Sequence, residues 1–376
     1  MKVKFFFLIL LIFGLLFSAC AQKDDTLKIG ISLPLTGDAA IWGKSLKEGY
    51  DLALNQINQT GGIKGKRLEL IYGDDQGLPK EGISLLQKFI TQDKIKILTG
   101  VANSSVALAM IPIVDQNKIL FISSGASSPK LSGASKLFLR TWPSDIAEAI
   151  AMANFARDSL KYTKIAILYI NNEYGIGLQQ PYTKRFQELG GQVVSEESFE
   201  QDAVDFRAQL TKIKKLEYDA IYLAGNPREM ARCIKQAKEL GIQKQILGIS
   251  TLKEKEVLDI AGAASEGVLF TDASYDPNSS NQATQKFVSS FEVKFSEQPG
   301  ILAVTAYDAM MVIKKSVEEC NCDLDTENLA EFLRNMGTYQ GASGTISFDA
   351  NGDVKRDVRI TAIKNGKFEF YASASY

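Results

Sequence analysis

A short polar segment, suited to holding an anion, follows a stretch typical of a buried strand. Residues 94–100 read KIKILTG, and Asn103, Ser104 and Ser105 come shortly after that glycine and before an apolar run with helical spacing. Ser104 can cap this helix, and the free backbone N–H groups and positive dipole end of its first turn would face the same way. The chemistry that these residues suit is the binding of a carboxylate.

The chain contains no histidine. Histidine is the usual general base near neutral pH and the usual partner of a nucleophilic serine or cysteine, so most familiar hydrolase mechanisms are excluded. Catalysis by lysine or a carboxylate stays open in principle, but no short motif argues for it. The glycines of TGGIKGKR, residues 60–67, lack the spacing and the Lys-Ser/Thr ending of a phosphate loop, and a turn is the better interpretation. We expect a binding protein without a cofactor, not an enzyme.

Composition limits the choice of partners. The 376 residues are 45% hydrophobic, and 43 basic residues balance 44 acidic ones. That composition can form one large core or two ordinary ones, and two lobes are the expectation. No basic stripe with interleaved aromatic residues is present, so nucleic acid is not an expected partner.

The first twenty residues predict export and tethering to a membrane. Two lysines in MKVK precede thirteen uncharged residues, and the small residues Ser18 and Ala19 stand before Cys20. This pattern resembles a bacterial lipoprotein signal peptide over residues 1–20, with Cys20 as the lipidated residue. Phe17, where leucine is usual, counts against the cleavage site, and an uncleaved anchor helix is the alternative. Both place the body on the periplasmic or outer side of a membrane.

The remaining cysteines do not suggest a framework. Cys320 and Cys322 are one residue apart, a spacing that we take as too tight for an unstrained bridge, and Cys233 lies in a helical stretch. We therefore expect no disulfide. Without histidine the Cys-x-Cys pair also lacks the partners of a four-ligand zinc site, so no metal is expected.

Strand-like and helix-like stretches alternate along the chain, which predicts an α/β fold with parallel sheets covered on both faces. The pattern occurs twice. Each copy has an aromatic-glycine pair just before its first helix, Trp42-Gly43 and Tyr174-Gly175, and a double glycine after it. Since such sheets bind ligands beyond the carboxyl ends of their strands, Trp42 and Tyr174 are expected on facing walls of a cleft. The alternative is that each ring only covers its own lobe.

The order and spacing of several segments resemble the extracytoplasmic solute-binding proteins of ABC transporters, in the branched-chain amino acid family. The segments are KIGISLPLTGDAAIWG, TGVANSSVALA, ILFISSGASSPKLS, FLRTWPSD, KIAILYINNEYGIG, AGAASEGVLFT and TAYDAM. The resemblance covers nearly all of residues 27–376. It implies the type I periplasmic binding protein fold, in which two Rossmann-like lobes with parallel sheets close on a ligand about a three-crossing hinge.

The same resemblance implies the domain boundaries. The hinge crossings are expected near residues 143–146, 272–276 and 343–347. Lobe one is expected over 27–144 plus 275–343, and lobe two over 145–274 plus 344–376.

The resemblance also implies the ligand-binding residues. In the family, a serine at the position of Ser104 and the loop at the positions of Gly125 to Ser127 hold the ligand carboxylate. Trp42 and Tyr174 stand at the positions of aromatic residues that pack on the ligand. The full expected set is Trp42, Ser104, Gly125, Ala126, Ser127, Tyr174, Asn226, Ser250 and Leu302. Asn226 or Pro227, and Leu302, stand where the family has aromatic residues, so the pocket is expected to differ there.

Ser250 is the largest departure, because the family's α-amino acid binders have a glutamate there for the ligand ammonium. An unpaired buried ammonium costs on the order of several kcal/mol, so an α-amino acid would need another carboxylate. The candidates are Glu173, Asp145, Glu229 and Asp272. The expected ligand is a small amphiphile with an acid or amide head. Leucine-like amino acids, aromatic or short aliphatic acids, amides and urea-like compounds all stay open.

The resemblance implies a monomeric receptor that delivers this solute to ABC permease subunits. A ligand sensor of the same fold, signalling to a regulatory partner, is the alternative. Exposed charges such as Lys212, Lys214 and Lys215 do not separate the two.

Overall fold

The computed structural model describes residues 26–37, 39–273, 275–356 and 358–374. The expected signal peptide and lipidated Cys20 lie outside the described residues. Within the described part, no helix combines the length and the apolar composition that a membrane span requires.

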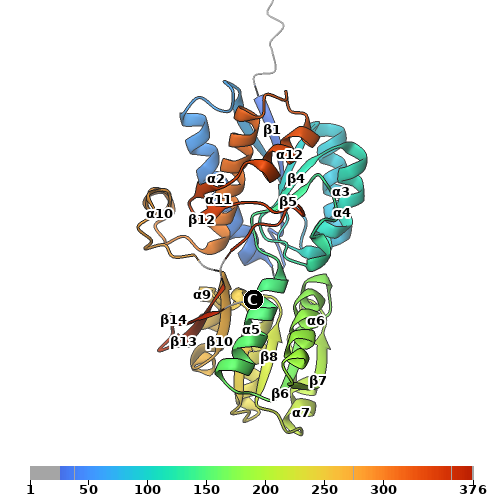
Figure 1. The fold of residues 1–376 in the computed structure, drawn as a ribbon, viewed down its shortest axis with the longest axis vertical. Coiled ribbons are helices and arrows are strands. Elements are labelled where there is room, and N and C mark those ends of the chain that lie inside the picture. The colour runs from blue at the N-terminus through green and yellow to red at the C-terminus, as the bar shows by residue number, and fades with distance from the viewer. Residues whose placement is uncertain (1–25, 38, 274, 357, 375–376) are drawn as a thin grey trace, which may run out of the picture.

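Two sheets, one above the other along the long axis of the molecule, form two lobes (Figure 1). The sheet of the first lobe has the order β2-β1-β3-β4-β5, and every neighbouring pair is parallel. Its elements are β1 (Thr26–Leu33), α2 (Ala40–Gln59), β2 (Arg67–Asp74), α3 (Pro79–Lys88), β3 (Ile97–Gly100), α4 (Ser104–Asn117), β4 (Leu120–Ser123) and β5 (Phe138–Arg140). Three later helices and a hairpin join this lobe: α10 (Gln282–Phe295), α11 (Ile301–Glu319), α12 (Thr326–Asn335), β11 (Tyr339–Gly341) and β12 (Gly344–Ile346).

The sheet of the second lobe repeats that arrangement. Its parallel part has the order β10-β9-β8-β6-β7, and two antiparallel strands, β13 and β14, extend it at the β10 edge. Its elements are α5 (Asp145–Asn154), β6 (Lys164–Ile170), α6 (Glu173–Glu188), β7 (Gln192–Phe199), α7 (Arg207–Lys214), β8 (Ala220–Ala224), α8 (Pro227–Glu239), β9 (Gln245–Gly248), α9 (Lys255–Ala261), β10 (Leu269–Ala273), β13 (Val358–Lys364) and β14 (Lys367–Ala374). The predicted α/β fold of two Rossmann-like lobes is confirmed.

Each lobe has its own hydrophobic core. The first core includes residues from Leu27 to Trp142 and, later in the chain, from Tyr275 to Val354. The second core includes residues from Ala149 to Phe270 and resumes at Ile360. Because Phe348 and Val354 pack in the first core, the third crossing lies later in the chain than the expected 343–347.

The repeated aromatic-glycine pair has the same steric cause in both lobes. A Cβ atom on Gly43 would lie 2.1 Å from the carbonyl oxygen of Pro34, and one on Gly175 would lie 2.0 Å from that of Ile170. Only glycine allows each helix to start this close to the end of the preceding strand. This close approach sets the position of the aromatic residue that precedes each glycine.

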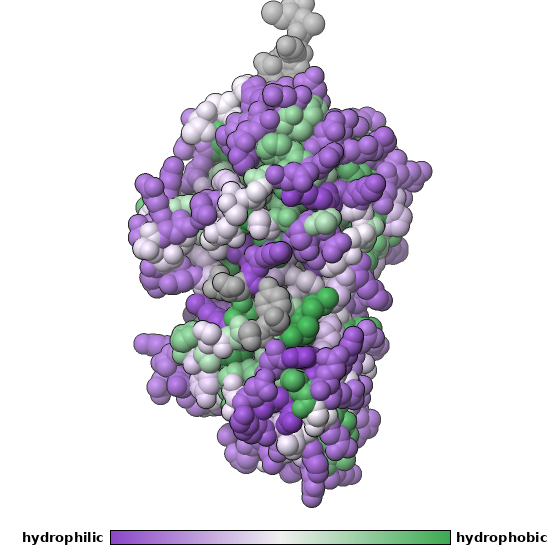
Figure 2. All heavy atoms as spheres, viewed as in Figure 1, coloured by the Kyte–Doolittle hydropathy of each residue, from purple (hydrophilic) through white to green (hydrophobic). Residues whose placement is uncertain are grey.

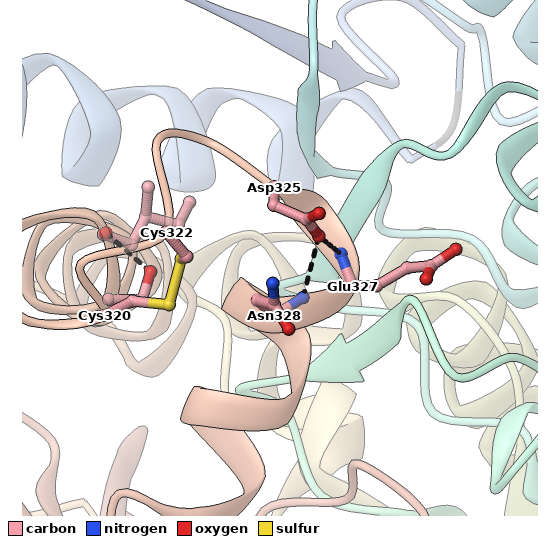
Figure 3. The surroundings of a disulfide bond; sticks show 7 residues. Cys320, Cys322, Asp325, Glu327 and Asn328 are labelled. Atoms are coloured by element: carbon pink, nitrogen blue, oxygen red, sulfur yellow. Dashed lines mark hydrogen bonds between the residues drawn. A yellow bond between two sulfur atoms is a disulfide. The ribbon is translucent and has the colours of Figure 1, made fainter.

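A disulfide joins Cys320 and Cys322 at the end of α11, so the expectation of no disulfide was wrong (Figure 3). The chain turns sharply here, since Asn321, at φ 54°, has a left-handed backbone conformation. That turn leaves the two Cα atoms 5.3 Å apart, within the normal range for a bridge. Just beyond it, the Asp325 carboxylate accepts two backbone N–H groups and caps α12. The spacing alone could not reveal this turn.

Candidate functional site

A cavity lies between the two lobes, beyond the carboxyl ends of both parallel sheets. Its free space is narrow, with about 30 Å³ open to the centre of a water molecule. The first lobe lines it with Trp42, Ala102, Asn103, Gly125, Ser127, Trp142, Ile301 and Leu302, and the second lobe with Tyr174, Ser250, Thr251 and Glu254. Several of these residues directly follow strands, at the place where doubly wound sheets bind ligands. We call this space the interlobe cavity.

Two aromatic rings from opposite lobes meet at the interlobe cavity. Trp42, in the first turn of α2, and Tyr174, in the first turn of α6, have ring centroids 6.0 Å apart and planes at 90°. Burial raises the pKa of Tyr174 well above its ordinary value, and the nearby carboxyl group of Asp145 adds to the shift. The Tyr174 hydroxyl therefore stays neutral and can donate or accept a hydrogen bond.

Ser104 does not line the cavity, and it is not the cap of α4. The helix begins at Ser104, its N-cap residue is Asn103, and no side chain caps it. The Ser104 hydroxyl oxygen instead accepts the backbone N–H groups of Ser127, at 3.2 Å, and Ser128, at 3.0 Å. Ser104 thus positions the next loop. Within the part of the chain that the structure describes, no side chain accepts a hydrogen bond from the first-turn N–H groups of α4.

The loop after β4 contributes Gly125 and Ser127 to the wall. A Cβ atom on Gly125 would lie 3.0 Å from the Cα atom of Ala102, so glycine lets the two loops pack against each other. Ala126 is fully buried and does not line the cavity; its N–H donates to the Ser123 hydroxyl at 2.9 Å. Ser127 lies between the cavity and the buried Asp145, whose backbone N–H donates to the Ser127 carbonyl at 2.9 Å.

Asn226 also stays away from the cavity. It is the N-cap of α8, where its side chain and that of Glu229 form a reciprocal capping box. Of the residues expected to bind ligand, the structure therefore brings six to one cavity: Trp42, Gly125, Ser127, Tyr174, Ser250 and Leu302. Ser104 and Ala126 lie behind its wall.

None of the four carboxylates proposed to replace the family glutamate lines the cavity. Glu173 forms an ion pair with Lys130 at 2.8 Å, and Asp272 forms one with Lys253 at 2.6 Å. Asp145 lies behind Ser127, and burial raises its pKa well above the ordinary value. Glu229 belongs to the capping box of α8.

Ser250 is held at the cavity wall by a buried carboxylate of α5. Glu148 accepts the Ser250 N–H at 3.0 Å, the Ser250 hydroxyl at 2.7 Å and the Thr271 hydroxyl at 2.8 Å. Burial raises the pKa of Glu148, and the bonds from Ser250 oppose that shift. Because its one hydroxyl proton goes to Glu148, Ser250 offers only a hydrogen-bond acceptor to the cavity.

Five cavity residues were not indicated by the sequence as ligand-binding residues: Ala102, Trp142, Thr251, Glu254 and Ile301. Asn103 was noted only as part of the polar segment before α4. Trp142 follows β5, so the strand-end rule could have found it. Glu254 follows a short turn, Ser250–Leu252, which no sequence pattern indicated.

The waist between the lobes also carries hydrophobic surface on the outside (Figure 2). Ile146, in the first turn of α5, is 39% exposed there and lines an outer groove together with Pro129 and Ile176. The ion pair between Lys130 and Glu173 joins the two lobes at this groove. The lobes thus contact each other on this side of the interlobe cavity.

Comparison with known proteins gives one family. Residues 26–367 match the periplasmic binding protein family model. The chain is similar to the leucine-, isoleucine-, valine-, threonine- and alanine-binding protein of Pseudomonas aeruginosa, with 30% identity over 341 residues and 90% of each chain covered.

Solved structures agree with this match. A leucine-binding protein of Thermotoga maritima has a TM-score of 0.87 and 30% identity, over 93% of this chain and 99% of that one. A branched-chain amino acid transporter substrate-binding protein of Streptococcus pneumoniae, in complex with isoleucine, has a TM-score of 0.84 and 25% identity, with the same coverage. The chain therefore belongs to the periplasmic binding protein family, and within it to the branched-chain amino acid ABC transport type.

Proposed function

We propose that this protein binds a small amphiphilic solute in the interlobe cavity, closes on it and delivers it to an ABC permease. The observation that carries the proposal is the meeting of Trp42 and Tyr174, from different lobes, at a cavity that also borders the uncapped start of α4. The rings offer a surface for an apolar side chain. The helix start offers N–H donors and a positive dipole end for a carboxylate or amide head.

The candidate solutes follow from the two kinds of surface in the cavity, one apolar and one that offers N–H donors. The name of the Pseudomonas aeruginosa relative includes leucine, isoleucine, valine, threonine and alanine, which are small and carry a carboxylate. Together with related carboxylates and amides, these form the first set of compounds to test. Ile301 and Leu302 add apolar wall at the start of α11, which favours the aliphatic members of the set.

The binding test is thermal. A solute that binds only the folded protein raises its stability by RT ln(1 + [L]/Kd), about 2.7 kcal/mol at one hundred times Kd. We expect at least one compound of the set to raise the melting temperature, and we expect the rise to be smaller in Trp42→Ala. If no amino acid, organic acid or amide changes the melting temperature, the proposal fails.

We also propose that Cys20 carries a lipid which tethers the protein to the outer side of a membrane. The sequence of residues 1–20 supports this. Full-length protein expressed in a bacterial host should fractionate with membranes, and Cys20→Ser should lose metabolic labelling by a radioactive fatty acid. Labelling that persists in Cys20→Ser would contradict the proposal.

A further inference from the structure

The carboxylate of Glu254 lies at the interlobe cavity and takes no part in the hydrogen bonds that hold the described part of the fold together. It stands at the N-cap position of α9, but its side chain makes no capping hydrogen bond. Among the described residues, its carboxylate has no hydrogen-bond or ion-pair partner, and it lines the cavity. Removing an unpaired carboxylate from water costs free energy unless a bound group neutralises its charge.

The neighbouring basic side chains are engaged elsewhere. Lys253 directs its ammonium to Asp272 at 2.6 Å, and Arg228 directs its Nε to Glu256 at 2.7 Å. No lysine, arginine or histidine lines the described wall of the interlobe cavity. The described wall of the cavity therefore supplies no cation that would stabilise the ionised form of Glu254, whereas a cationic group of a ligand could.

The two walls of the cavity differ in the groups that they offer. On the first lobe, the start of α4 provides backbone N–H groups that the Asn103 side chain does not cap. On the second lobe, Ser250 offers only an acceptor, with the buried Glu148 directly behind it. A ligand that fits both walls has a negative group toward the first lobe and a positive group toward the second.

We propose that the Glu254 carboxylate binds a cationic group of the solute, so that the solute is a zwitterion such as an α-amino acid. Glu254 would supply the negative charge that Ser250 does not. This inference rests on the proposed function and narrows its solute class, since simple acids, amides and urea-like compounds lack the cation.

Burial raises the pKa of Glu254 to about 7, with the charge of Glu256 adding to the shift and that of Lys253 opposing it. Tyr174 lines the same cavity from the same lobe and stays neutral in this range. Because an ammonium prefers the ionised carboxylate, affinity for a zwitterion should rise with pH. A carboxyl group with a pKa of about 7 is roughly one-tenth ionised at pH 6 and nine-tenths at pH 8, which predicts a gain of about tenfold.

The test compares L-leucine with 4-methylpentanoate, which has the same carbon skeleton without the amine, by calorimetry on the whole protein. In Glu254→Gln we expect the Kd of L-leucine to rise by about 30-fold or more. The Kd of 4-methylpentanoate should stay unchanged or fall, because a negative charge has left the cavity. Asp259→Asn is the matched control, since it removes an exposed carboxylate from the same helix α9 outside the cavity, and it should change neither Kd.

The outcomes separate this inference from the proposed function. If the wild type binds 4-methylpentanoate as tightly as L-leucine, or if Glu254→Gln weakens both equally, the Glu254 inference is overturned and the binding function stands. If the wild type binds neither these compounds nor any other of the set, the proposed function and the inference both fail. Should Glu254→Gln not fold, the wild type alone decides: L-leucine affinity that does not rise between pH 6 and pH 8 overturns the inference.

Discussion

The rings of Trp42 and Tyr174 meet edge to face, with their centroids 6.0 Å apart. Trp42 belongs to α2 of the first lobe and Tyr174 to α6 of the second, so this contact requires the lobes to be together. The same two rings line the interlobe cavity. Lobe closure and the shape of the cavity are therefore linked through this pair.

Removing either ring should weaken solute binding, and the two losses should not add. We expect Trp42→Ala and Tyr174→Ala each to raise the Kd of the best ligand by about tenfold or more. A double-mutant cycle measured by calorimetry should give a coupling of about 0.5–1.5 kcal/mol. Tyr371→Ala is the control, because Tyr371 makes its edge contact with Phe155 inside the second lobe and should leave the Kd unchanged. Strictly additive losses would mean that the rings act independently.

Tryptophan fluorescence should report binding through both tryptophans. The chain has two, Trp42 and Trp142, and both line the interlobe cavity. Ligand should therefore still change the emission of Trp42→Phe, through Trp142, and of Trp142→Phe, through Trp42. A titration of each single variant tests this. Loss of the entire signal in Trp42→Phe alone would place Trp142 outside the binding site.

Alanine at either repeated glycine should destabilise the protein. The added Cβ atom would lie 2.1 Å from the Pro34 carbonyl oxygen in Gly43→Ala and 2.0 Å from that of Ile170 in Gly175→Ala. Such contacts force the helix start away from the strand, and we expect a loss of about 2 kcal/mol or more in the free energy of unfolding. Chemical denaturation measures it. Gly300→Ala, whose Cβ would meet only the Ser45 hydroxyl at 3.9 Å, should cost less, about 0.5–1 kcal/mol, because alanine is a poorer N-cap of α11 than glycine.

Glu254 should make stability depend on pH in the absence of ligand. Its pKa of about 7 in the folded protein lies above the ordinary value of 4.5, so the folded state holds this proton more tightly than the unfolded state. The contribution therefore favours folding at low pH and is lost as pH rises through 7. The melting temperature of Glu254→Gln should match that of the wild type near pH 4 and exceed it by about 2 °C at pH 8. An equal difference at both pH values would contradict the assigned shift.

The fold could be predicted because its signals are local. Strand and helix patterns alternate along the chain, and a glycine follows each of Trp42 and Tyr174. These glycines indicate close packing of a helix start on the preceding strand end. The prediction that Trp42 and Tyr174 share a cavity depended on the same rule of strand ends. Those patterns come from backbone geometry, which a single sequence expresses directly.

The polar groups of the site could not be predicted as well, because their roles depend on contacts between distant segments. Ser104 was expected to cap α4, but its hydroxyl accepts N–H groups of a loop more than twenty residues later. From the sequence, Ser250 was interpreted only as the residue that replaces the family glutamate. In the structure it donates hydrogen bonds to Glu148, about a hundred residues away. No sequence motif surrounds Glu254, and only its position at the cavity indicates a role in binding.

The most direct test is a crystal structure of the protein with L-leucine or the best ligand of the thermal screen. We predict one solute molecule in the interlobe cavity beside the paired rings of Trp42 and Tyr174, its carboxylate at the start of α4 and its ammonium at Glu254. A solute bound elsewhere, or an interlobe cavity that stays empty at saturating ligand, would contradict the account.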